Sequence, residues 1–245
     1  FPYTTLFRSL ALNRTYLKRI IAIGGPAGLQ GMIFSVSNIV IQAAINHFGA
    51  ACVAGNSAGL NFEYISYFFV NGFAQATVTF ISQNYAAHQY QRCRRIARVA
   101  MVSAILFTTI VSSAFYLFRY PLVDDIFSTN PAVVHYAIIR ITFIALLEPL
   151  TATYEIAGGS LRGIGHSMAP AVITLVGCCI LRVVYIAVML PHFTSFTQVA
   201  LIYPVTWIIT GTAVMLLYEA VTRKAYVTEN LAVTPNSEMQ LMPHH

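Results

Sequence analysis

Long apolar segments alternate with short polar connections along almost the whole chain. Six such segments lie near residues 20–46, 51–81, 96–118, 133–158, 168–190 and 197–218. Each contains at least the roughly 20 mostly apolar residues that an α-helix needs to cross the hydrocarbon core of a bilayer. The pattern predicts an all-α integral membrane protein with six transmembrane helices.

Basic residues fall on every second connection between these segments. They are Arg14, Lys18 and Arg19 before the first segment, Arg92, Arg94, Arg95 and Arg98 after the second, Arg162 after the fourth, and Arg223 and Lys224 after the sixth. The other connections hold Arg119 beside Asp124 and Asp125. Because cytoplasmic loops carry an excess of Lys and Arg, we expect both ends of the six-helix unit in the cytoplasm of a cell inner (plasma) membrane.

Composition supports a membrane protein. Hydrophobic residues make up 57% of the chain and charged residues only 9%, against about 25% charged residues in soluble domains. The formal net charge is +6, but the basic residues flank the apolar segments instead of gathering on one surface. We therefore expect contacts with membrane lipid and no nucleic-acid partner.

Motifs for catalysis and metal binding are lacking in the sequence. The four cysteines form no CxxC pair and the seven histidines are scattered, so we expect no metal site and no cofactor. There is no GxSxG, HExxH, Walker A or dinucleotide-binding motif. We expect that the protein is not an enzyme.

The two ends of the chain differ from the rest. Residues 1–9, FPYTTLFRS, resemble the in-frame translation of a common sequencing-library adapter, so we expect the biological sequence to begin near Leu10. The transmembrane unit would then occupy residues 10–226. Residues 227–245 are polar and are expected to form a disordered cytoplasmic tail.

Small and polar residues form a stripe on the first segment. Gly28, Gly31, Ser35, Asn38, Gln42 and Asn46 follow one another at steps of three or four, which places them on one face of a helix. Pro26 should bend this helix. The stripe either packs against another helix or lines a cavity that contacts substrate.

The second segment carries a carboxylate deep in the bilayer. One face holds Asn56, Gly59, Glu63, Ser66, Tyr67 and Val70. Glu63 lies about 18 Å from the outer end at 1.5 Å per residue, close to the bilayer midplane. It either binds a coupling ion or substrate, or forms a structural ion pair with Arg140 or Arg182. The aromatic residues Tyr64, Tyr67, Phe68 and Phe69 either line a pocket for flat organic cations or face lipid.

The fourth segment carries further charges. Glu148 and Glu155 are seven residues apart, hence on one helical face, and Pro149 predicts a kink beside Glu148. Glu148 is the deeper carboxylate and the better candidate for binding a proton or cation. Glu155 is expected to organise the following loop and Arg162.

Three parts of the sequence resemble the MATE (multidrug and toxic compound extrusion) transporter family. They are Gly24–Gly49, Val53–Ala87, and Glu155–Ile173 with the downstream ILRVVYI at 180–186. The residues of the family motifs are Pro26, Gln83, Asn84, Arg162, Gly163, Gly165, Ser167 and Pro170. The similarity is to the carboxy-terminal six-helix lobe of the family.

The resemblance implies one lobe of a two-lobe, twelve-helix transporter that exchanges organic cations for H⁺ or Na⁺. The partner lobe would be a missing amino-terminal half of the same polypeptide. Phe34 and Thr151 stand where the NorM-type branch has acidic residues, so the resemblance points to the DNA-damage-inducible-F-like branch. Ala86 stands where the family has a glycine that eases a turn.

The leading hypothesis is the C-terminal half of a cation-coupled multidrug efflux antiporter that works by alternating access. The candidates for binding substrate or coupling ion are Asn38, Gln42, Glu63 and Tyr67, with Glu148 as an accessory carboxylate. Arg140, Glu155 and Arg182 are structural or secondary candidates. The alternatives are a flippase for lipid-linked oligosaccharides, which inward-facing Arg140 and Arg182 would favour, and a non-transporting membrane scaffold.

Overall fold

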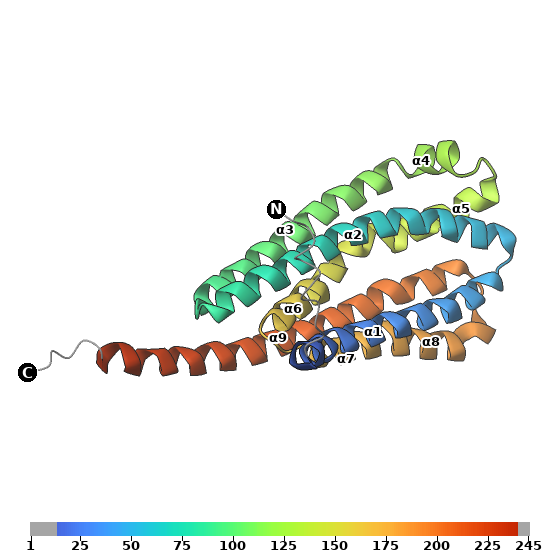
Figure 1. Cartoon of the computed structure of the whole chain (residues 1–245). Coiled ribbons are helices and arrows are strands. Elements are labelled where there is room, and N and C mark those ends of the chain that lie inside the picture. The colour runs from blue at the N-terminus through green and yellow to red at the C-terminus, as the bar shows by residue number, and fades with distance from the viewer. Residues whose placement is uncertain (1–13, 240–245) are drawn as a thin grey trace, which may run out of the picture.

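The computed structural model describes residues 14–239, and every regular element in that range is helical (Figure 1). The α-helices are α1 (Arg14–Asn46), α2 (Ala50–Ala86), α3 (Tyr90–Leu117), α4 (Arg119–Ile126), α5 (Pro131–Phe143), α6 (Thr151–Gly163), α7 (Met168–Leu175), α8 (Leu181–Met189) and α9 (Phe196–Met239). Three short elements join them: the 3₁₀ helix η1 (Ala145–Leu150), the π-helix η2 (Val176–Ile180) and the 3₁₀ helix η3 (Leu190–His192). The all-α class is confirmed.

Six long helical segments correspond to the six predicted spans: α1, α2, α3, α5–η1–α6, α7–η2–α8 and α9. Within the described residues, five of them are long and apolar enough to cross a membrane. The exception is α2, which has 37 residues but carries polar side chains such as Asn56, Glu63 and Asn71 along its length. These three side chains line a cavity and do not face lipid. They lower the average hydropathy of α2, although a polar side chain that faces a cavity is compatible with a membrane-spanning helix.

The long helices form two groups in space. Figure 1 shows α2, α3 and α5 side by side, and α1, α7–α8 and α9 side by side, with α6 between the groups. The largest cluster of buried residues joins the groups, since it includes Ile81 of α2, Leu161 of α6 and Trp207 of α9. A smaller cluster, with Phe62 and Ile141, fixes α2 against α5.

The breaks in the long segments have local causes. Asn130 caps α5 by accepting a hydrogen bond from the Ala132 backbone N–H (3.0 Å), and Pro131 takes the first helical position, where its missing N–H costs nothing. Pro149 cannot donate to the helical hydrogen-bond ladder, and the chain forms η1 around it. The kink predicted beside Glu148 is thus a 3₁₀ segment. Neither η2 nor the short helix α4 was predicted.

Two details differ from the sequence interpretation. The helix α9 continues to Met239, although a disordered tail was expected from residue 227; few strong helix breakers follow Lys224 until Pro235. Ala86 stands where the family has a glycine that eases a turn, but here it is still part of α2. In the turn that follows α2, the residue with a positive φ (56°) is His88. Residues 1–9, interpreted as adapter-derived, lie outside the described residues.

Candidate functional site

A cavity of about 660 Å³ lies between the two groups of helices. Its wall is built from α1, α2, α5, η1, α6, α8 and α9, so residues from both halves of the sequence meet there. The charged lining residues are Glu63, Arg140, Glu148, Glu155, Arg162 and Arg182, and the aromatic ones are Phe34, Tyr64, Tyr67, Tyr154, Tyr203 and Trp207. All candidate substrate- and ion-binding residues of the sequence analysis are among the lining residues.

The first helix contributes part of its predicted polar stripe. Asn38 and Gln42 line the cavity together with Gly31, and the Gln42 amide donates to the Asn46 side-chain oxygen (3.1 Å). Ser35 instead donates to its own helix at the Gly31 carbonyl (3.0 Å). The structure therefore places the middle of the stripe in the wall of a cavity. Of the two interpretations, helix packing and cavity lining, the second describes these residues.

Glu63 is paired with Arg140. The Arg140 Nη2 donates to Glu63 Oε2 at 2.6 Å, and Arg140 Nη1 donates to Asn56 Oδ1. Arg140 and Glu63 are both buried. Of the two partners considered for Glu63, the structure selects Arg140.

Gly59 makes room for this pair. A Cβ added at Gly59 would lie 2.9 Å from the Arg140 Cβ and 3.1 Å from its Cδ, closer than side-chain atoms normally approach. Ser66 and Val70, predicted to share the face of Glu63, are instead fully buried away from the cavity, and Ser66 Oγ accepts a hydrogen bond from Ser112 Oγ of α3 (3.2 Å). The cavity face of α2 is thus narrower than the predicted face.

Glu148 lies in η1, where the helix is interrupted. Its side chain is 2% exposed, yet its Oε2 has no hydrogen-bond partner among the described residues. Thr151 Oγ1 donates to the backbone carbonyl of Glu148 (2.7 Å). A buried carboxylate oxygen without a partner is costly unless a cation, proton or water satisfies it.

Arg182 faces the same cavity from α8, directly after the π-helix η2. Its Nε donates to Thr206 Oγ1 (2.9 Å), and its guanidinium lies 4.2 Å from the centroid of the Tyr203 ring. The Nη2 is buried without a partner. Single-turn π segments inside α-helices are frequent at functional sites, and here the segment immediately precedes a cavity-lining arginine.

A further group of contacts in the cavity wall joins Tyr67, Glu155 and Arg162. The Tyr67 hydroxyl donates to Glu155 Oε1 (3.3 Å), and Glu155 Oε2 lies 3.8 Å from Arg162 Nη2. Glu155 thus contacts Arg162, the residue it was expected to organise. Tyr64 also lines the cavity, whereas Phe68 is 67% exposed on the outer surface of α2.

Gln83, Asn84, Gly163, Gly165, Ser167 and Pro170 lie at or near helix ends and are not among the residues that line the cavity. The Gln83 carbonyl accepts from the Ala87 N–H (3.2 Å), and Asn84 donates to its own helix. Gly163 faces Ile81 of α2, where a Cβ would lie 2.9 Å from a side-chain carbon, and Gly165 has φ +90°. These residues, with Ser167 and Pro170, shape the turns at the ends of α2 and α6. The backbone at Pro26 is helical, but its side chain lies outside the described part of the structure.

Several cavity residues were not found by sequence reasoning, among them the aromatic residues Tyr203 and Trp207. Tyr203 and Trp207 are one helical turn apart on α9 and both line the cavity, with Tyr203 beneath the guanidinium groups of Arg140 and Arg182. Their spacing of four and the single tryptophan in the chain were available signals. Among the residues whose side chains the structure describes, no three His, Cys, Asp or Glu residues form a cluster able to hold a metal ion.

The cavity combines groups suited to binding a charged organic molecule. Three carboxylates and three guanidinium groups lie around it with six aromatic rings. Carboxylates and aromatic faces attract cations, while guanidinium groups attract carboxylates and phosphates. The arrangement offers binding of charge but no constellation of nucleophile and general base.

The chain is similar to known proteins. The MatE family profile matches residues 26–188. The probable multidrug resistance protein NorM of Thermotoga maritima is 24% identical over 176 residues, which are 72% of this chain and 38% of that protein. The FAD transporter of Shewanella oneidensis is 28% identical over 123 residues, which are 50% of this chain and 27% of that protein.

A solved structure shows the same fold. The Vibrio cholerae MATE transporter VcmN in the bent form superposes with a TM-score of 0.77 at 21% identity, over 90% of this chain and 49% of that one. The chain therefore spans less than half the length of these relatives. From its family profile and its membrane-spanning helices, the chain belongs to the MatE family of multi-pass membrane transporters.

Proposed function

We propose that the chain is the C-terminal six-helix lobe of a cation-coupled multidrug efflux antiporter in the cell inner membrane, with both ends of the lobe in the cytoplasm. The observation that carries the proposal is that two buried carboxylates, Glu63 and Glu148, lie in the wall of a cavity lined by aromatic rings. A carboxylate deep in a membrane protein binds a coupling ion, a cationic substrate or a fixed counter-ion. H⁺ or Na⁺ and a small organic cation would compete for these groups.

The face of α1 supports a missing partner lobe. A Cβ added at Gly24, Gly28 or Gly31 would meet no atom within 4 Å, so these three glycines of α1 face away from the other described helices. Small residues in transmembrane helices normally permit close helix contact. An amino-terminal lobe of the same polypeptide would cover this face and close the cavity, and rocking of the lobes would expose the cavity alternately to each side.

The mechanism depends on exchange of partners at Glu63. Arg140 occupies the Glu63 carboxylate at 2.6 Å, so an incoming cation or proton has to weaken this pair. The Glu148 oxygen without a partner provides a second acceptor nearby in the same wall. Release of the arginine and protonation of the carboxylates would then accompany the change of access.

The test is efflux of ethidium by the complete transporter in cells that lack other efflux pumps. We expect Glu63→Gln and Glu148→Gln to reduce ethidium efflux at least tenfold while the protein remains in the membrane. Asp124→Asn, on the exposed face of α4, is the matched control and should transport normally. Undiminished efflux by both cavity variants at normal expression would contradict the coupling role.

A second candidate, transport of phosphate-bearing anions, rests on Arg182. Its Nη2 is buried without a partner and faces the cavity, and one relative is named an FAD transporter. A flippase for lipid-linked oligosaccharides would use such a group for pyrophosphate. In that case Arg182→Gln would abolish anion transport, whereas for the antiporter it would leave ethidium efflux measurable.

A further inference from the structure

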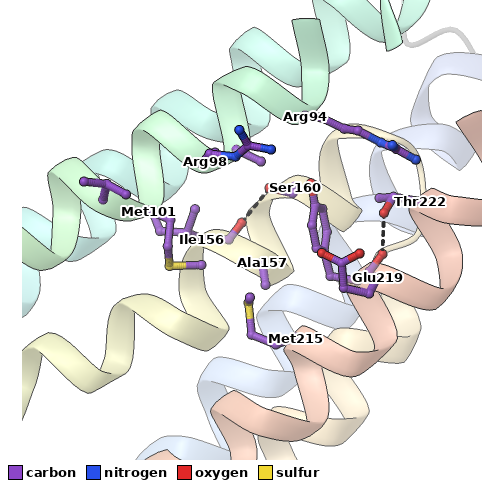
Figure 2. Close-up of a pocket in the computed structure, with 12 residues that line it drawn as sticks. Arg94, Arg98, Met101, Ile156, Ala157, Ser160, Met215, Glu219 and Thr222 are labelled. Atoms are coloured by element: carbon purple, nitrogen blue, oxygen red, sulfur yellow. Dashed lines mark hydrogen bonds between the residues drawn. The ribbon is translucent and has the colours of Figure 1, made fainter. Parts of the chain in front are cut away.

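A second pocket lies away from the cavity, between α3, α6 and α9. It has a volume of about 280 Å³, and Figure 2 shows Arg94 and Arg98 of α3 opposite Glu219 and Thr222 of α9, with Ser160 of α6 between them. Arg94 and Arg98 lie one turn apart on a helix whose basic residues mark the cytoplasmic end. The pocket therefore sits at the level of the lipid headgroups.

Two residues of opposite charge in this pocket, Arg98 and Glu219, remain apart from each other. Arg98 and Glu219 are both exposed, and no ion pair joins them among the described residues. A ligand that carries an anion next to a cation could contact both at once. The arginine side suits a phosphate, because guanidinium groups bind phosphate oxygens in a planar fork, and the Glu219 side suits an ammonium group.

An apolar groove continues from the pocket toward the middle of the bilayer. The groove has a volume of about 360 Å³ and shares Met215 and Glu219 with the pocket. It extends along α9 to Ile208, which is eleven residues from Glu219, or about 16 Å at 1.5 Å per residue. That length matches half of the roughly 30 Å hydrocarbon core, which is the depth that an acyl chain reaches.

The groove owes its depth to close packing of α9 on α6. A Cβ added at Gly211 would collide with the Thr153 hydroxyl, so the backbone of α9 approaches α6 closely at this point. On the outer side, Ile208 and Leu216 are 55% and 67% exposed, as expected for residues beside lipid. The charged pocket thus opens at one end of an apolar groove, which is the order of polar headgroup and acyl chain in a phospholipid.

We propose that this pocket and groove bind a phospholipid whose headgroup has a primary ammonium group next to the phosphate, as in phosphatidylethanolamine. Arg94 and Arg98 would contact the phosphate, Glu219 the ammonium group, and the groove one acyl chain. The site is separate from the transport cavity, since the two share no lining residue. An inactive transporter could therefore still bind this lipid, and the two proposals can fail independently.

The test is native mass spectrometry of the purified complete transporter with added phosphatidylethanolamine or phosphatidylglycerol of identical acyl chains. We expect phosphatidylethanolamine to be retained about fivefold better, the size of effect that one weak charge contact gives. Arg98→Gln should lower retention of both lipids. Glu219→Gln should lower retention of phosphatidylethanolamine alone and so remove the preference.

Arg95→Gln is the matched control, because Arg95 lies on the same helix but lines a different pocket with Arg92. It should leave both lipids retained as in the wild-type protein. Equal retention of the two lipids by the wild-type protein, or a preference that survives Glu219→Gln, would overturn the proposal. If water-soluble glycerophosphoethanolamine displaced the lipid at equal concentration, the acyl groove would have no role and the lipid assignment would be wrong.

Discussion

At the scale of single residues, the Glu63–Arg140 pair dominates the cavity wall. Both side chains are buried, and Arg140 also donates to Asn56. A buried pair often adds little stability compared with apolar residues, but loss of one partner leaves an uncompensated charge. The pair thus ties the charge state of Glu63 to the position of α5.

We expect Arg140→Gln to destabilise the protein by about 3 kcal/mol, because it leaves the Glu63 carboxylate buried without its counter-ion. Glu63→Gln combined with Arg140→Gln should recover part of that loss. Thermal unfolding of the detergent-solubilised protein, followed by size-exclusion chromatography, measures both effects. A double variant no more stable than Arg140→Gln would show that the pair has no energetic coupling.

Gly59→Ala tests the space for Arg140. The added Cβ would meet Arg140 at 2.9 Å, and overpacking of this kind costs typically about 1–3 kcal/mol. Gly72→Ala on the same helix is the control, because its Cβ would meet no atom within 4 Å and alanine favours helix. Unfolding temperatures should therefore fall for the first variant and hold or rise for the second.

Much of the residue-level site could be predicted from sequence, but its pairing could not. Polar residues stand out in apolar helices, so Asn38, Gln42, Glu63 and Glu148 were identifiable one by one. The choice of Arg140 over Arg182 as the partner of Glu63 depends on how α5 and α8 rotate against α2, which periodicity within one helix does not specify. Tyr203 and Trp207 were missed because aromatic residues are ordinary in membrane helices.

At the scale of elements, the long apolar runs predicted the membrane-spanning segments, and Pro149 predicted the kink beside Glu148. Both predictions were possible because each depends on a short stretch of sequence. The π-helix η2 was not predictable, because the sequence VGCCI contains no helix breaker beyond one glycine. The structure shows a close tertiary contact at this glycine. A Cβ at Gly177 would collide with the Thr210 side chain of α9, so α9 packs directly on the backbone of η2.

We therefore expect Gly177→Ala to push η2 away from α9 and to lower the unfolding temperature. Thr210→Ala removes the hydroxyl that the new methyl group would meet, so the double variant Gly177→Ala/Thr210→Ala should regain part of the lost stability. Both are measured by thermal unfolding against each single variant. Strict additivity of the two changes would show that Gly177 and Thr210 are not coupled.

At the scale of the whole molecule, the six-span topology is open to labelling. The four native cysteines are buried, which keeps background reactivity low. A cysteine introduced at Thr129, in the exposed connection after α4, should react with a membrane-impermeant maleimide in intact cells. One introduced at Gln89, between α2 and α3, should react only after the cells are opened, and the reverse result would invert the proposed orientation.

Sequencing the gene upstream of this chain tests whether a partner lobe exists. If the chain is the C-terminal half of a transporter, the reading frame upstream of the codon for Leu10 should encode six further apolar spans. Coexpression of that half should increase the yield of this one, because it covers the small-residue face of α1. A start codon adjacent to Leu10 would instead favour a homodimer of this chain.

The balance of charge around the cavity has a consequence for the membrane potential. Glu63, Glu148 and Glu155 face Arg140, Arg162 and Arg182, so with all six ionised the empty wall carries no net charge. An electric field does work on moved charge, about 2.3 kcal/mol per elementary charge for every 100 mV. If all six stay ionised, reorientation of the empty lobe moves no net charge of this wall through the field, and a bound cation or proton supplies the charge on which the membrane potential acts.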